Sequence, residues 1–135
     1  MTDTAPLVAS VRIEATPPEV FQYLVDPALF VLWMGEWAEL DAHAGGTFAV
    51  DLGDTRVRGH FVHVEPPHRV VFTWGVPGDD VLPEGSTTVE VALTPDGTGT
   101  IVELTHRDVP AVQVPGHRAG WTLHLDRLCV AVAPG

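Results

Sequence analysis

The segment Val114–Leu128 reads VPGHRAGWTLHLDRL, and its periodicity decides how the rest of the sequence is interpreted. Large apolar residues recur at i, i+4, i+7 and i+11, which is the spacing of one face of an amphipathic helix. These residues are Trp121, Leu125, Leu128 and Val132. Pro115 is tolerated in the first turn of a helix, and Pro134 with Gly135 ends it. The pattern predicts a long C-terminal helix that buries one apolar stripe.

The segment from residue 37 to residue 107 alternates apolar and polar residues, which is typical of half-buried β-strands. Turn residues interrupt the alternation repeatedly. They are Gly45-Gly46, Gly53-Asp54, Pro66-Pro67 and Pro95-Asp96-Gly97. Short strands joined by tight turns predict an antiparallel meander of about six strands.

One strand and two short helices are predicted before this meander. Residues 11–14 alternate apolar and polar side chains, as a strand does. Thr16 and Glu19, with proline between them, have the spacing of a capping box at a helix start. Asp26 followed by Pro27 predicts the start of a second short helix in the same way.

The order of these elements predicts an α+β fold. An antiparallel sheet must cover one of its faces, and the only long amphipathic element is the C-terminal helix. We therefore expect a curved antiparallel sheet of about six or seven strands wrapped around that helix. No repeat or linker divides the chain, so residues 1–135 are expected to form a single domain.

The composition argues against several classes of protein. The chain has 18 acidic residues against seven arginines and no lysine, a formal charge of −11. Such a surface repels phosphate backbones, so neither nucleic-acid binding nor docking on anionic membranes is expected. The sequence has no apolar run long enough for membrane insertion and no signal-peptide pattern at its start. A lone cysteine, Cys129, cannot form an internal disulfide, and we expect a cytoplasmic protein.

Five segments in this order resemble the helix-grip fold of the START-like, or SRPBCC, superfamily, also known from birch-pollen allergens. They are PPEVFQYLVDPALFVLWMG (17–35), AHAGGTF (42–48), RGHFVHVEPPHRVVFTW (58–74), TVEVALTPDGTGTIVELTH (88–106) and GHRAGWTLHLDRL (116–128). The chain is most similar to the bacterial single-domain branch named after the C-terminal domain of the activator of heat-shock-protein-90 ATPase. The resemblance implies an apolar cavity between sheet and helix. It does not imply one function, because the superfamily includes ligand carriers, polyketide cyclases and hormone receptors.

The seven histidines do not form a recognisable metal motif. His60 and His63 are three apart on a predicted strand and should point to opposite faces. His117 and His124 share a helix face but lie roughly 10 Å apart along its axis. The sequence also has no GxSxG elbow, phosphate-binding loop or dinucleotide fingerprint. We therefore expect no metal and no cofactor.

The side chains predicted to line the cavity are mostly aromatic, with a few polar groups, as in many small-molecule sites. They are Trp33, Phe48, Phe72, Trp74, Leu104, His106, His117, Trp121 and His124. The three histidines are candidates for a general acid or base, since histidine titrates near neutrality. Whether His60 or Phe61 faces the cavity depends on a strand register that the sequence leaves open.

Structural roles explain the same residues. His106 can end its strand with a local hydrogen bond, His117 can form a hydrogen bond at the helix start, and His124 can flank the core stripe. The tryptophans can be core residues. Gly120 lies in mid-helix, where glycine costs about 1 kcal/mol relative to alanine, so a close backbone approach is expected there.

Three functional hypotheses follow. The first is a protein that binds an apolar or aromatic small molecule, and the second is a cyclase-like or dehydratase-like enzyme that uses a cavity histidine. The third is a protein-interaction module without a ligand, by analogy with the chaperone activator. Binding without turnover is favoured, because no convergent acid, base and oxyanion group is evident. Edge strands of such sheets can pair, so a homodimer is one option.

Overall fold

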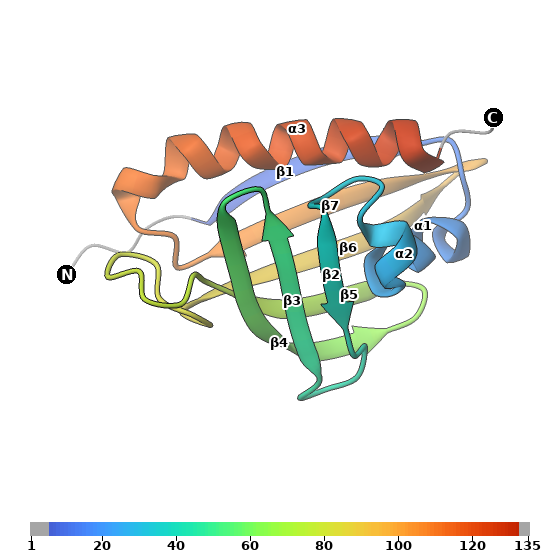
Figure 1. The fold of residues 1–135 in the computed structure, drawn as a ribbon. Helices are drawn as coiled ribbons and strands as arrows, with labels where there is room; N and C mark the ends of the chain where they lie inside the picture. Colours follow the sequence, from blue (N-terminus) through green and yellow to red (C-terminus); the bar gives the residue numbers. More distant parts are fainter. Residues whose placement is uncertain (1–5, 133–135) are drawn as a thin grey trace.

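The computed structural model describes residues 6–132 and shows a curved antiparallel sheet with a long helix along it (Figure 1). The strands are β1 (Leu7–Ile13), β2 (Trp37–Leu40), β3 (Thr47–Leu52), β4 (Thr55–Glu65), β5 (Arg69–Trp74), β6 (Thr87–Asp96) and β7 (Gly99–Arg107). The helices are α1 (Pro17–Val25), α2 (Pro27–Phe30), a 3₁₀ turn (Ala111–Gln113) and α3 (Val114–Val132). This architecture confirms the predicted helix-grip fold.

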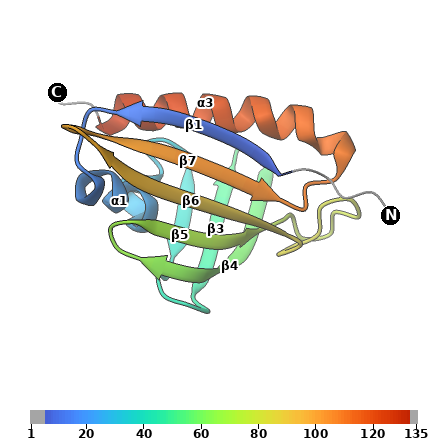
Figure 2. The same ribbon diagram turned by 180° about the vertical axis from the view of Figure 1, so that it is seen from behind.

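The seven strands form one sheet in the order β1-β7-β6-β5-β4-β3-β2. This order makes β1 and β2 the two edges of the sheet, and all neighbouring strands are antiparallel. Both views show α3 running beside β1, with the strands curving away from it (Figures 1 and 2). The predicted stripe is buried in this position: Trp121, Leu125, Leu128 and Val132 are all at most 8% exposed. The helix therefore covers the concave face, as its periodicity predicts.

Strand β4 bends the sheet, because its two halves pair with different neighbours. Residues 55–60 pair with β3, and residues 61–65 pair with β5 after a register shift. At the bend, the backbone N–H of His60 donates to the side-chain oxygen of Thr73 at 2.9 Å. A Cβ atom on Gly59 would overlap the carbonyl oxygen of Thr73. A side chain at position 59 is therefore incompatible with this close crossing of β4 and β5.

The short helices α1 and α2 begin where the sequence predicts, but only one has the predicted cap. The Asp26 side chain accepts hydrogen bonds from the backbone N–H groups of Ala28 and Leu29, which caps α2. At the start of α1, the Thr16 hydroxyl donates to the Glu19 carboxylate instead of accepting from the backbone. The predicted capping box is therefore wrong, although Thr16 still occupies the N-cap position.

Aromatic side chains from β3, β4 and β5 fill one part of the interior. The rings of Phe48 and Phe72 stack with their centroids 3.9 Å apart, and Phe61 meets Phe48 edge-on at 5.7 Å. Phe61 is fully buried and His60 is exposed, which answers the register question left by the sequence. Close packing of this kind leaves little room for a ligand in this part of the interior.

None of the helices within residues 6–132 combines the length and apolar character needed to cross a membrane.

The bend in β4 gives the first prediction. Gly59→Ala places a methyl group against the Thr73 carbonyl, so we expect the free energy of unfolding to fall by about 1–3 kcal/mol. Urea denaturation followed by tryptophan fluorescence measures the change. Gly120→Ala is the matched control, because a Cβ there meets no atom within 4 Å. Equal stability of Gly59→Ala and the wild type would show that β4 and β5 do not cross this closely.

Candidate functional site

A fully buried histidine connects α3 to the sheet. The Trp121 indole Nε1–H donates to His106 Nδ1 at 3.0 Å. On the other side of the ring, His106 Nε2 lies 2.8 Å from Thr87 Oγ1, which donates to the backbone carbonyl of Trp74 at 2.6 Å. These contacts join α3, β7, β6 and β5 in one chain of hydrogen bonds.

The donors in this chain determine the protonation state of His106. An indole N–H can only donate and a carbonyl can only accept, so Nδ1 is the acceptor and Nε2 carries the proton. A second proton on Nδ1 would face the indole N–H. Burial is the main cause that lowers the pKa of His106, and nearby His117 lowers it further, to about 3. His106 is therefore a neutral structural residue with both ring nitrogens occupied.

A pocket of about 320 Å³ opens beside this chain, under the N-terminal half of α3. Its sheet-side and loop wall consists of Leu52, Thr55, Val57, Trp74, Val76, Asp79 and Leu82. Its helix wall consists of Gln113, Gly116, His117, Gly120, Trp121 and His124. The rings of Trp74 and Trp121, with centroids 5.0 Å apart, meet where the two walls join. This volume lies within the range of small-molecule pockets, and its walls are largely apolar.

His117 is the histidine best placed to act on a ligand in this pocket. Its Nδ1 lies 3.0 Å from the backbone carbonyl of Gln113, the helix-start hydrogen bond that the sequence predicts. Because a carbonyl only accepts, Nδ1 carries a proton, and in the neutral ring the lone pair is on Nε2. The side chain is half-buried and lines the pocket, so Nε2 is the ring nitrogen available to a ligand.

His124 lies farther along the same wall, and one of its ring nitrogens lacks a hydrogen-bond partner within residues 6–132. Burial, the largest cause, lowers the pKa of His124; the backbone of Trp33 opposes this effect and the charge of Arg127 adds to it. The ring is therefore mainly neutral near pH 7. Its Nδ1 is buried and has no hydrogen-bond partner within residues 6–132.

The helix wall contains two glycines that packing does not require. A Cβ atom on Gly116 or Gly120 would meet no other atom within 4 Å. The expected close backbone approach at Gly120 is therefore wrong. Glycine in a helix interior costs about 1 kcal/mol relative to alanine, and nothing in the protein offsets this cost. The missing side chains leave the backbone of α3 open to the pocket.

The remaining predicted site residues lie elsewhere. Phe48, Phe72 and Leu104 are packed in the core at most 3% exposed, and His106 lies behind Trp121. None of these four lines either of the two pockets described here. Phe48 and Phe72 instead stack against each other in the aromatic cluster of the interior.

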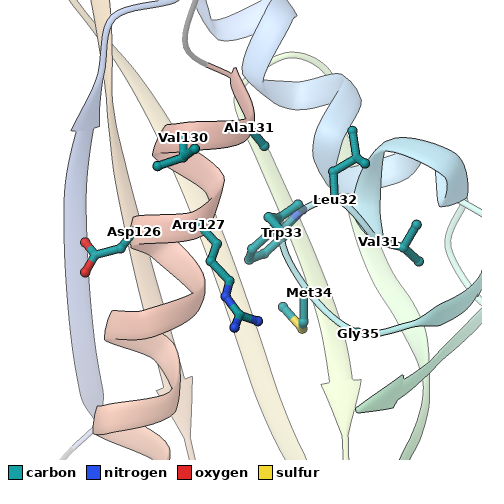
Figure 3. A pocket seen from close by; sticks show the side chains of 9 residues that line it. All are labelled: Val31, Leu32, Trp33, Met34, Gly35, Asp126, Arg127, Val130 and Ala131. Carbon is teal, nitrogen blue, oxygen red and sulfur yellow. The ribbon is translucent and has the colours of Figure 1, made fainter. Parts of the chain in front are cut away.

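Trp33 belongs to a second pocket of about 530 Å³, toward the C-terminal end of α3 (Figure 3). This groove lies between the segment 31–35 and the last turns of α3. Arg127 extends across it toward Trp33 and Met34, whereas Asp126 points away. Leu32 and Val130 at its rim are exposed. The predicted ligand-binding residues are thus divided between two pockets and the core.

The sequence did not predict most of the pocket wall. Apart from Trp74, the wall residues from 52 to 82 were not among the predicted site residues, and neither were the glycines of α3. Most of them lie on the bend of β4 and on the loop after β5, which reads as polar in sequence. Leu82 is the informative exception, because this apolar residue in a polar loop is only 4% exposed. Asp79 folds the loop inward by accepting from the backbone N–H groups of Val81 and Leu82.

Within residues 6–132, no group of three or more His, Cys, Asp or Glu side chains is arranged to hold a metal ion.

Comparisons with known proteins connect this architecture to one family. The family model described as Activator of Hsp90 ATPase homolog 1-like protein matches residues 14–133. No curated protein sequence matches significantly. Among solved structures, CalU16 from Micromonospora echinospora has a TM-score of 0.78 and 28% identity, over 94% of this chain and 75% of that chain.

Two further structures are similar. DynU16, a protein in the dynemicin biosynthetic locus, has a TM-score of 0.81 and 27% identity, over 94% of this chain but only 46% of its own. The Aha1 dimer from Colwellia psychrerythraea has a TM-score of 0.84 and 16% identity, over 98% of each chain. At this identity the last comparison shows a shared fold.

The buried histidine predicts a pH dependence of stability. The pKa of His106 is about 3 in the folded protein against 6.5 for an unperturbed histidine, so between these values only the unfolded chain binds the proton. Stability therefore falls as the pH is lowered through this window. We expect a loss of about 2–3 kcal/mol between roughly pH 6.5 and pH 4.5, with a smaller contribution of the same sign from His124.

Urea denaturation at several pH values measures this loss. The control variant His63→Gln removes an exposed histidine and should keep the same pH dependence. A His106 ring resonance that titrates above about pH 5 in the NMR spectrum of the folded protein would contradict the assignment.

Proposed function

This chain belongs to the family of Activator of Hsp90 ATPase homolog 1-like proteins, and we propose that it binds an apolar or aromatic small molecule in the pocket under the N-terminal half of α3. The observation that carries the proposal is the pocket of about 320 Å³ walled by Trp74 and Trp121. Both indoles are at most 4% exposed. The hydrogen-bond chain through His106 holds the Trp121 indole and ends at the backbone carbonyl of Trp74. Aromatic walls that are already rigid lose little conformational entropy when a ligand binds, so the free-energy cost of binding is lower.

The similar proteins support a small-molecule role. DynU16 is a protein in the dynemicin biosynthetic locus, and its similarity covers nearly the whole of this chain. We take a place in a biosynthetic locus as support for a small-molecule ligand. A pocket with apolar walls and few polar groups suits a ligand of this kind.

Ligand screening with a blocked pocket tests the proposal. A compound at 100 times its dissociation constant should stabilise the wild type by about 2.7 kcal/mol, seen as a rise in melting temperature. Thr55→Trp adds a large side chain at the pocket rim and should abolish this rise. Leu32→Trp is the control, because it fills the groove at the C-terminal end of α3 and should leave the rise unchanged. If Leu32→Trp abolished the rise and Thr55→Trp left it unchanged, the ligand would bind in that groove instead.

A second candidate is a cyclase-like or dehydratase-like enzyme with His117 as general base. The hydrogen bond from Nδ1 to the Gln113 carbonyl orients the ring and leaves Nε2 to accept a proton from a ligand. His106 cannot take this role near neutral pH, since both of its nitrogens are occupied. His124 would then contact the substrate without being needed to orient the base.

Substitution of His117 distinguishes an enzyme from a protein that only binds the ligand. For an enzyme, His117→Ala should reduce turnover by at least about 100-fold, the usual contribution of acid–base catalysis, while binding changes little. Mass spectrometry of products measures turnover, and calorimetry measures binding. Turnover that survives in His117→Ala would exclude His117 as the base. Binding with no turnover in the wild type would identify a carrier.

An interaction role and a homodimer remain proposals of a different class. The similar protein from Colwellia psychrerythraea is described as a dimer. Within residues 6–132, the edge strands β1 and β2 of the present sheet each pair with a strand on one side only. Unpaired edge strands can pair with a second copy. Light scattering of the purified protein distinguishes a dimer from a monomer.

A further inference from the structure

The helix wall of the pocket has an unusual composition for a buried helix face. Gln113, Gly116, His117, Gly120 and Trp121 follow one another at intervals of one or three residues, so they share one face. Neither glycine has a positive φ, and an added Cβ at either would meet only open space. Backbone conformation and packing thus both permit alanine at these two positions. What the glycines do achieve is a strip of helix backbone without side chains beside His117 and Trp121 on the pocket wall.

The charges around the pocket restrict the ligand in a second way. No arginine lines the pocket and the chain has no lysine, so no basic side chain can pair with an anion there. The Asp79 carboxylate is part of the wall. Its hydrogen bonds with the backbone N–H groups of Leu82 and Val81 lower its pKa, so it stays ionised. A ligand carboxylate would therefore meet an unpaired negative charge in a chain of net charge −11.

The available polar groups of the pocket mostly accept hydrogen bonds. In the neutral His117 ring, Nε2 carries the lone pair, because Nδ1 donates to the carbonyl of Gln113. The Asp79 carboxylate can only accept when ionised. A ligand that brings hydroxyl donors matches this set better than one that brings acceptors.

We propose that the pocket selects an uncharged, flat aromatic ligand bearing hydroxyl donors, whose ring face lies on the α3 backbone at Gly116 and Gly120 and whose hydroxyl donates to His117 Nε2. The inference rests on the proposed binding function and adds the class and orientation of the ligand. The two glycines are then specificity-determining residues, because a methyl group at either position occupies the space of the ring.

Two matched probes test the charge preference. 2-Naphthol and naphthalene-2-carboxylate have the same fused rings, but at pH 7 the first is a neutral hydroxyl donor and the second is an anion. Isothermal titration calorimetry should show at least tenfold tighter binding of 2-naphthol by the wild-type protein. Equal binding, or tighter binding of the carboxylate, would overturn the proposed ligand class. If neither probe binds, the proposed binding function fails for simple aromatic ligands, and this inference fails with it.

Glycine substitutions test the orientation through two effects of opposite sign. Gly116→Ala and Gly120→Ala should each raise the urea midpoint, because alanine favours the helix, and each should weaken 2-naphthol binding at least tenfold. The control Ala119→Gly changes helix propensity on the exposed face of α3, so it should lower the midpoint and leave binding unchanged. Alanine variants that are more stable and bind 2-naphthol as well as the wild type would overturn the inference while leaving the proposed function intact.

His117→Phe tests the proposed hydrogen bond with the ring size nearly kept. We expect weaker binding of 2-naphthol but little change for naphthalene, which has no hydroxyl group to donate. An equal loss for both compounds would show that the substitution distorts the pocket and that Nε2 does not accept from the ligand.

Discussion

The hydrogen bond from the Trp121 indole to His106 is the interaction on which the arrangement of helix and sheet depends. The indole N–H, the imidazole and the Thr87 hydroxyl are all buried, and a buried polar group without a partner costs about 1–3 kcal/mol. Neutral imidazole offers one acceptor and one donor on opposite sides of its ring, so it satisfies both neighbours at once. The position of α3 over β6 and β7 is therefore specified by direction as well as by apolar contact.

The two ends of the interface between α3 and the sheet serve different purposes. At one end, the buried side chains of Leu125, Leu128 and Val132 fill the space and stabilise the fold. At the other end, Gly116 and Gly120 leave the helix surface bare although alanine would fit and would favour the helix. Residues that reduce stability without a structural reason are characteristic of functional surfaces. The same helix thus combines a tightly packed half with a half that leaves volume for a ligand.

Local patterns in the sequence were sufficient for the elements and for most of the core. The helical spacing from Trp121 to Val132 and the alternation in the strands are visible in the sequence, because periodicity reflects which face of an element is buried. Local reasoning failed where two options fit the same pattern. The Thr16 hydroxyl bonds the Glu19 side chain in place of the backbone, and Gly120 faces a void where a close contact was expected.

The sequence by itself determined the class of fold, the order of its elements and the buried stripe of α3. Only the tertiary structure decided that His106 is a neutral link, that Phe61 and not His60 faces the interior, and that the pocket lies under the first half of α3. The physical reason is that a void is what remains after distant side chains have filled the available volume. Trp74, Leu82 and Trp121 define that remainder together, and no local pattern carries their combined shape.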